Sequence, residues 1–295
     1  MDHTIQLGCE KSFVILGIRL CNLPPPGKSL KHENVEAITL SPVTQSNGEV
    51  VYEQLEESIA KTGVPRMIVG DYGSDLKAGV SKFCQAHPET SYIYDIKHKT
   101  ATLLKRELSP MEAWGEFIRL ASQTKSLLQQ TSLAHHRPPN QRAKARYMNV
   151  DKLVKWGIEQ LKFLDQTENK PEKLTEKLGW LWDYRENIEE WNELINEVTC
   201  VENFVKKQGL TQQSHDELSK QLEKQLPRPL SLKTQKVRHK LLEFVKEQGN
   251  NAGTSERLLG IRCVIESVFG KQKRLEQDQA KSGFTGLVLG RVRSF

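Results

Sequence analysis

Three acidic residues lie at the ends of predicted strands or on a predicted helix, where the backbone would hold their carboxylates in fixed positions. Asp2 precedes the first apolar run, Asp71 follows a short apolar run that ends at Gly70, and Glu266 lies in an amphipathic stretch near the end of the chain. Two aspartates and a glutamate on rigid elements suit magnesium, which binds a few carboxylates and keeps several waters. Two such ions, with Mn²⁺ as a substitute, can activate the attacking oxygen and stabilise the leaving oxygen in phosphodiester cleavage.

Two further aspartates compete with Asp71 for the middle position. Asp75 is better interpreted as a helix cap, and Asp95 ends the next predicted strand, beside the basic residues Lys97–Lys99. Asp71 also has a simpler interpretation, as a turn residue before Gly73. The pattern favours Asp71 over Asp95, but spacing alone does not prove that the three carboxylates converge.

The first third of the chain alternates strand-like and helix-like segments. Apolar or β-branched runs predict strands, and three-to-four spacing of apolar residues predicts helices. The predicted segments are strands over 3–8, 12–20, 66–70 and 91–96 and helices over 49–62 and 76–86. The first two strands indicate a hairpin, and the later alternation predicts an α/β layer with a partly parallel sheet.

From residue 109 onward the strand signals disappear. The apolar spacing predicts helices over 111–130, 150–164, 171–208 and 232–248. The apolar stripe of the third helix indicates a packing face, as in a helical hairpin or a coiled coil. Its tryptophans, Trp180, Trp182 and Trp191, are more typical of a core than of a base-stacking surface.

A last helix is predicted over 255–279, with Ser255 as its cap. Arg262, Glu266 and Lys273 share one face of this helix, away from its apolar stripe. An acidic residue among basic residues is typical of a surface ion-pair ladder, so Glu266 needs a further argument before it is assigned to chemistry.

Basic residues are concentrated in residues 97–148 and 227–295, which flank an acidic middle at 149–226. A basic surface attracts a polyanion such as DNA because each neutralised phosphate releases counterions. A solvated lysine-rich surface is the alternative explanation. The candidate phosphate contacts in a basic loop of the first block are Arg142, Lys144 and Arg146.

Other classes of site and location are disfavoured. Five scattered cysteines without a CxxC pair argue against a disulfide framework or a structural zinc. Gly27–Ser29 looks like the end of a phosphate-binding loop, but Asn22 stands where the earlier glycine is required, so we expect no nucleotide cofactor. The early apolar run is short and contains Arg19, so we expect no signal peptide, no membrane partner and a cytoplasmic protein.

Four segments of the sequence resemble the DDE transposases of bacterial insertion sequences, most closely a group common in cyanobacteria. They are Asp2–Gly8, Ser12–Arg19, Ile68–Leu76 and Val264–Lys273. The resemblance extends over most of the chain. It implies an RNase H-like fold, in which a mixed sheet with flanking helices carries the first acidic residue on strand one, the second at the end of strand four and the third on a late helix.

Asp2, Asp71 and Glu266 occupy those positions, so the resemblance implies that they are the catalytic residues and the ligands of two Mg²⁺ ions. Several such families also carry an arginine four residues before the glutamate and a lysine seven after it, which Arg262 and Lys273 match as expected DNA contacts. The tyrosine seven residues before the glutamate is replaced by Leu259, which weakens the inference about DNA ends.

The long separation between Asp71 and Glu266 resembles family members with a large insertion before the third acidic residue. We therefore expect a first part of the catalytic core at 1–108, an all-helical insertion at 109–254, and the last helix with a truncated tail at 255–295. The insertion would shape the DNA site or support a homodimer, and the pattern does not decide between the two. The abrupt start and the abrupt finish of the sequence lead us to expect a partial gene copy.

The expected function is metal-dependent cleavage and strand transfer of DNA at the nucleoid, with the element ends and target DNA as partners. Two alternatives stay within the same lineage: a catalytically defective DNA-binding remnant, and an RNase H-like nuclease that cuts but does not join. A helical scaffold without DNA affinity is a third alternative, of a different class.

Overall fold

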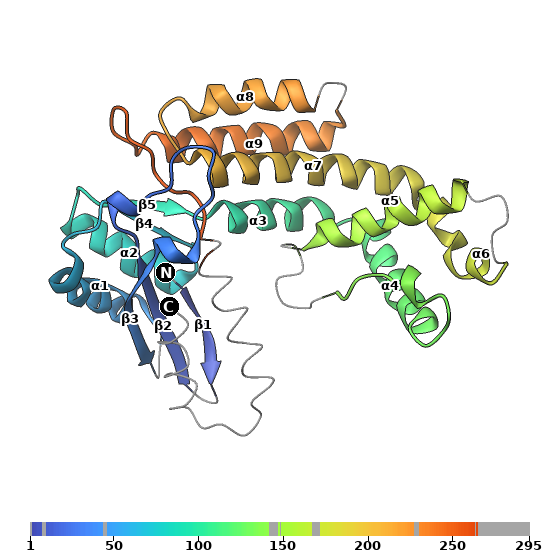
Figure 1. The fold of residues 1–295 in the computed structure, drawn as a ribbon, viewed down its shortest axis with the longest axis horizontal. Helices are drawn as coiled ribbons and strands as arrows, with labels where there is room; N and C mark the ends of the chain where they lie inside the picture. The colour runs from blue at the N-terminus through green and yellow to red at the C-terminus, as the bar shows by residue number, and fades with distance from the viewer. Residues whose placement is uncertain are drawn as a thin grey trace. The chain divides into compact units, whose positions relative to one another are not determined.

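The computed structural model describes residues 2–7, 10–43, 46–141, 147, 149–166, 172–226, 230–262 and 264. The chain divides into two compact units, drawn in Figure 1. The strand unit consists of Met1–Ile96, Asn203–Ser214 and Val245–Phe295, and the helical unit of Lys97–Glu202 and His215–Phe244. Strands and helices both occur, so the prediction of a mixed α/β protein is confirmed.

Three antiparallel strands form the first sheet of the strand unit. They are β1 (Asp2–Leu7), β2 (Glu10–Gly17) and β3 (Glu36–Val43), in the order β1-β2-β3. The predicted hairpin is confirmed by the pairing of β1 with β2. β3 was not predicted; it follows a loop with two short 3₁₀ turns, η1 (Leu20–Asn22) and η2 (His32–Asn34).

Two short parallel strands form the second sheet. β4 (Met67–Gly70) pairs in register with β5 (Ser91–Tyr94), so that Gly70 lies opposite Tyr94. A parallel pair requires a crossover, and α2 (Ser74–Ala86) provides it, as the alternation of the sequence predicts. The consequence is that the residues directly after both strands emerge at the same edge of this sheet.

The predicted helix over 49–62 is confirmed as α1 (Gly48–Thr62). Its start is fixed by Asn47, whose side chain accepts a hydrogen bond from the Val50 amide at 2.9 Å, and its end by Gly63, whose φ of 70° favours glycine. The apolar faces of α1 and α2 pack with residues of both sheets into one core. Its buried members are Phe13, Val51, Leu55, Ile68, Leu76, Val80 and Phe83.

The predicted start of a helix at Ser255 is wrong. Ser255 has a φ of 61°, in the left-handed region, and not the extended backbone of a helix cap. Leu258 forms a β-bridge with Leu210, and the chain is non-helical up to Arg262. Contacts with distant parts of the strand unit outweigh the local helical pattern here. Most of the remaining predicted helix lies outside the described residues.

Helices make up most of the helical unit. They are α3 (Ile96–Leu108), α4 (Glu112–Leu128), η3 (Ala134–His136), α5 (Val150–Gln166), α6 (Glu172–Leu178), η5 (Gly179–Tyr184), α7 (Arg185–Gln208), α8 (Ser214–Gln225) and α9 (Leu232–Gly249). The chain passes from one unit to the other after the first residue of α3, within α7, after the first residue of α8 and within α9. The predicted helices over 111–130, 150–164 and 232–248 are confirmed within a few residues, whereas α3 and α8 were not predicted. In Figure 1, α7, α8 and α9 lie side by side.

The predicted continuous helix over 171–208 is interrupted by η5. Tryptophan side chains anchor this turn to neighbouring helices: Trp180 donates its indole hydrogen to Thr124 at 3.0 Å, and Trp182 donates to Asp165 at 3.3 Å. Trp191 is fully buried as predicted, and its ring meets that of Trp114 edge-on with the centroids 4.8 Å apart. Trp182 is 39% exposed, so its assignment to the core is wrong.

Among the described residues, no helix is both long and apolar enough to cross a membrane. The predicted boundaries at residues 108 and 254 concern an insertion into a catalytic core. These boundaries remain a prediction. The two compact units are defined by the packing of their residues, and packing does not show whether one segment is inserted into another.

Candidate active site

Asp71 and Asp95 follow β4 and β5 directly, and the parallel register brings them to the same edge of the sheet. Gly70 pairs with Tyr94, and the amide of Asp95 donates to the carbonyl of Gly70 at 2.9 Å. The carboxyl ends of neighbouring parallel strands are common positions for functional side chains in α/β proteins. The two aspartates that competed in the sequence therefore belong to the same site.

One guanidinium joins the two carboxylates. Arg262 donates from Nε to Oδ2 of Asp95 at 3.0 Å and from Nη2 to Oδ2 of Asp71, also at 3.0 Å. The side chains of Arg262 and Asp95 are 3% and 0% exposed, whereas that of Asp71 is 20% exposed. Asp71 is therefore the carboxylate of the pair that solvent or a ligand can reach.

Asp71 also shapes the turn into α2. Its Oδ1 accepts a hydrogen bond from the amide of Gly73 at 3.1 Å, which is the geometry of an Asx turn. Its main-chain carbonyl accepts a hydrogen bond from the Tyr92 hydroxyl at 2.5 Å. The turn interpretation of Asp71 is thus correct, and these contacts hold the residue firmly at the strand end.

Three tyrosines pack beside Asp71. The ring of Tyr72 stacks on that of Tyr94 with centroids 4.3 Å apart and contacts the ring of Tyr92 at 4.7 Å. Burial raises the pKa of Tyr92, and the negative charge of Asp71 raises it further. Tyr92 therefore stays protonated at neutral pH and remains a hydrogen-bond donor to the Asp71 carbonyl.

The segment that carries Arg262 is fixed along β4. At one end of the strand, Arg66 donates to Oε2 of Glu256 and to the carbonyl of Asn251, both at 2.7 Å. The hydrogen bond from Arg66 is the main reason that the pKa of Glu256 lies below its usual value. Farther along, the Gly260 carbonyl accepts from the Ile96 amide at 2.9 Å. These contacts place Arg262 beside the carboxylates of Asp71 and Asp95, at the other end of β4.

The structure describes the other predicted site residues only in part. Asp2 is the first residue of β1 and pairs with Val14, but its side chain is outside the described residues. Glu266, Lys273, Arg142, Lys144 and Arg146 lie outside the described residues altogether. The convergence of Asp2, Asp71 and Glu266 therefore remains a prediction, as do all the DNA contacts.

The observed surroundings of Arg262 differ from the predicted ones. It was predicted on an exposed helical face, and it is instead buried and paired with Asp71 and Asp95. In this arrangement its guanidinium faces carboxylates, and a contact with a DNA phosphate remains a prediction.

The donor set suits a hard cation only in part. Carboxylate oxygens of Asp71 and Asp95 are the kind of ligand that Mg²⁺ prefers, but Asp95 is fully enclosed and Arg262 already supplies a positive charge. Within the described part of the chain, no group of three or more histidine, cysteine, aspartate or glutamate side chains is arranged to hold a metal. A complete metal site would need further ligands, such as the predicted Asp2 and Glu266.

Sequence reasoning treated Asp71 and Asp95 as alternatives and missed that both belong to one site, and it also missed the hydrogen bond from Tyr92. The first could have been found, because parallel strands bring the residues that follow them side by side. The second had no local signal, since it depends on the alignment of β4 with β5.

Comparisons of the chain with protein-family models, with curated proteins and with solved structures give no match.

Proposed function

We propose that the chain is the catalytic region of a DDE transposase, with Asp71 as a ligand of the catalytic Mg²⁺. The observation that carries the proposal is that Asp71 ends a parallel strand, is held there by Gly73 and Tyr92, and keeps a partly exposed carboxylate. The sequence around Asp71, Asp2 and Glu266 supports the same assignment through its resemblance to this family.

The order of elements in the strand unit supports an RNase H-like core as part of the proposal. Three antiparallel strands are followed by α1 and then by a parallel β4-α2-β5 unit. That order agrees with a fold whose second acidic residue stands at the end of the fourth strand. In this proposal residues 109–254 are the helical insertion.

Mg²⁺ bound by Asp2, Asp71 and Glu266 would activate a water for hydrolysis of a phosphodiester and then the freed 3′-hydroxyl for attack on target DNA. The protein holds the Asp71 carboxylate at the strand end. Asp95 keeps Arg262 beside it, so the two carboxylates and the guanidinium leave one net negative charge for a cation at Asp71. We expect Arg262 to stay bonded to Asp95 when Asp71 binds the ion.

The test is Mg²⁺-dependent nicking and strand transfer on a DNA fragment that carries the ends of the element. We expect Asp71→Asn and Glu266→Gln each to lower both activities by about 10³-fold or more, because each variant removes a metal ligand worth several kcal/mol of transition-state stabilisation. Asp75→Asn is the matched control. Asp75 lies four residues from Asp71, and its carboxylate accepts hydrogen bonds from Ser46 and Ser74.

Equal activity of wild type, Asp71→Asn and Glu266→Gln would overturn the assignment. Nicking without strand transfer would identify an RNase H-like nuclease. Salt-dependent DNA binding without any cleavage would identify a catalytically defective remnant. The pairing of Arg262 with Asp71 favours the remnant as the second candidate, because it places a fixed positive charge where a metal ion is required.

A further inference from the structure

Arg262 bonds to two carboxylates that differ in burial. Its Nε donates to Asp95 and its Nη2 donates to Asp71, each at 3.0 Å. The Asp95 side chain is 0% exposed, whereas that of Asp71 is 20% exposed. Water screens a pair of charges more strongly where one partner is exposed, so the bond to Asp71 is the weaker of the two.

Asp71 is also fixed by contacts that do not involve Arg262. Oδ1 of its carboxylate accepts a hydrogen bond from the Gly73 amide at 3.1 Å, and its main-chain carbonyl accepts one from the Tyr92 hydroxyl at 2.5 Å. Arg262 bonds to the other carboxylate oxygen, Oδ2. Departure of the guanidinium would therefore free Oδ2 for a cation and leave Asp71 held at the end of β4.

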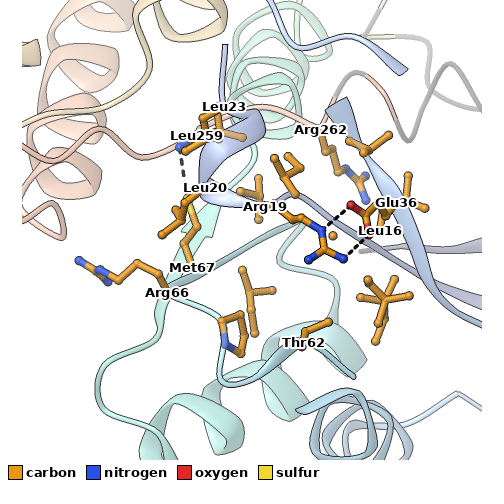
Figure 2. Close-up of a pocket in the computed structure, with 18 of the residues that line it drawn as sticks. Leu16, Arg19, Leu20, Leu23, Glu36, Thr62, Arg66, Met67, Leu259 and Arg262 are labelled. Atoms are coloured by element: carbon orange, nitrogen blue, oxygen red, sulfur yellow. Dashed lines mark hydrogen bonds and ion pairs between the residues drawn. The ribbon is translucent and has the colours of Figure 1, made fainter. Parts of the chain in front are cut away.

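The guanidinium of Arg262 has space into which it can move. Figure 2 shows Arg262 among the side chains that line a cavity of about 740 Å³ in the strand unit, together with Met67 of β4 and Leu259. Closely packed side chains resist displacement, whereas a side chain beside a cavity can change its rotamer. Nη2 can therefore leave Asp71 while Nε stays bonded to Asp95.

A divalent cation and Nη2 compete for Oδ2 of Asp71. A carboxylate binds a cation more weakly when a fixed positive charge is close to it. The negative charge of Asp95 offsets the guanidinium, and its hydrogen bond to Nε holds the guanidinium on the enclosed side of the site. Asp95 thereby lowers the repulsion that Arg262 exerts on a cation at Asp71.

We propose that Asp95 sets the affinity of Asp71 for a divalent cation by holding Arg262, the competitor for Oδ2. When the cation binds, Nη2 leaves Asp71 and Nε keeps its bond to Asp95. Asp95 is a positioning residue in this inference, because it acts on the cation through Arg262. The inference rests on the proposed function, since it takes Asp71 as the metal ligand.

The test measures Mn²⁺ binding to the full chain by electron paramagnetic resonance, which detects the free ion, so neither DNA nor cleavage is required. Mn²⁺ is the probe because it prefers the same oxygen ligands as Mg²⁺. Asp71→Asn should weaken Mn²⁺ binding at least about tenfold, because it removes a charged ligand. This variant establishes that the measured ion is bound at Asp71.

Arg262→Gln and Asp95→Asn should shift the Mn²⁺ affinity in opposite directions. Arg262→Gln removes the competing charge and should strengthen binding at least about tenfold. Asp95→Asn removes the charge that holds the guanidinium away from Oδ2 and should weaken binding by about the same factor. If the two residues had only a structural role, both variants would weaken binding, because both would disturb the site.

The double variant Arg262→Gln/Asp95→Asn tests whether Asp95 acts through Arg262. It should bind Mn²⁺ at least about tenfold more tightly than Asp95→Asn alone, because the competitor is absent. The double variant also removes both charges of the buried pair, so neither charge is left buried without a partner.

Asp75→Asn and Arg19→Gln are the matched controls, because each removes a charge of the same sign elsewhere in the strand unit. Asp75 lies four residues from Asp71, and its carboxylate accepts hydrogen bonds from Ser46 and Ser74. Arg19 is on the surface, where solvent screens its charge. Both variants should bind Mn²⁺ within about threefold of wild type.

If Arg262→Gln fails to fold, as judged by circular dichroism, the comparison of Asp95→Asn with the double variant still decides the inference. Equal binding by these two chains would overturn it, as would weaker binding by a folded Arg262→Gln chain. In either case the assignment of Asp71 stands if Asp71→Asn weakens binding. Unchanged Mn²⁺ binding by Asp71→Asn would overturn that assignment and the inference together.

Discussion

Replacement of Arg262 by glutamine should lower the free energy of unfolding of the strand unit by about 3–5 kcal/mol. Arg262 is the positive charge bonded to Asp95, whose side chain is 0% exposed, and loss of one partner of a buried ion pair leaves the other charge without compensation. The measurement is urea unfolding at neutral pH, followed by far-ultraviolet circular dichroism.

The matched control is Arg19→Gln. Arg19 likewise donates from two nitrogens to carboxylate oxygens, but both belong to Glu36, and the Arg19 and Glu36 side chains are 69% and 45% exposed, so we expect no measurable change in the unfolding midpoint. Equal midpoints for Arg262→Gln and wild type would show that the buried pair does not hold the segment 256–262 against β4.

A double-mutant cycle separates the ion pair from the rest of the site. Asp95→Asn removes the buried negative charge, so the double variant with Arg262→Gln should be more stable than the sum of the single changes predicts. Additive effects would mean that Arg262 and Asp95 stabilise the protein through unrelated contacts.

Arg238→Gln should destabilise the helical unit by a similar amount, about 3–5 kcal/mol. Arg238 in α9 makes two hydrogen bonds of 2.7 Å to the carboxylate of Glu197 in α7, and their side chains are 7% and 0% exposed. Arg238 also donates to the Leu226 carbonyl after α8. Its removal should therefore loosen the packing of α7, α8 and α9, and urea unfolding followed by tryptophan fluorescence measures the loss.

Arg119→Gln is the control for this second prediction. Arg119 pairs with Glu116 at 2.6 Å on the surface of α4, where solvent screens the charges, and we expect no measurable change. If Arg119→Gln and Arg238→Gln had the same effect, burial would not be the reason for the stability of the Arg238 pair.

The parts of the fold that were predicted correctly have strong local patterns. The hairpin of β1 and β2, the helices α1 and α2, and the position of Asp71 after β4 all follow from runs of apolar residues and their flanking turn residues. The alternative interpretation of Asp71, as a turn residue before Gly73, is confirmed by the hydrogen bond from the Gly73 amide to its side chain.

The parts that were predicted wrongly depend on contacts between distant residues. The helical spacing of Leu258 and Ile261 is satisfied without a helix, since Leu258 pairs with Leu210 and the segment runs along β4. The break before α7 depends on hydrogen bonds of Trp180 and Trp182 to other helices. Periodicity contains no information on either kind of contact.

The parallel pairing of β4 with β5 explains why both Asp71 and Asp95 looked like candidates. Each follows a strand of the same parallel pair, but their surroundings differ. Asp95 is enclosed and bonded to the Arg262 guanidinium, whereas Asp71 keeps a partly exposed carboxylate. We therefore assign Asp95 to positioning Arg262 and propose Asp71 as the metal ligand.

The most direct test of that proposal is the metal preference of DNA cleavage by Asp71→Cys. A thiolate is a poor ligand for Mg²⁺ and a better one for softer ions. We predict that Asp71→Cys loses nicking activity with Mg²⁺ and regains part of it with Mn²⁺ or Cd²⁺, while Asp75→Cys behaves like wild type with every ion. Full Mg²⁺-dependent nicking by Asp71→Cys would contradict the assignment of Asp71 as a metal ligand.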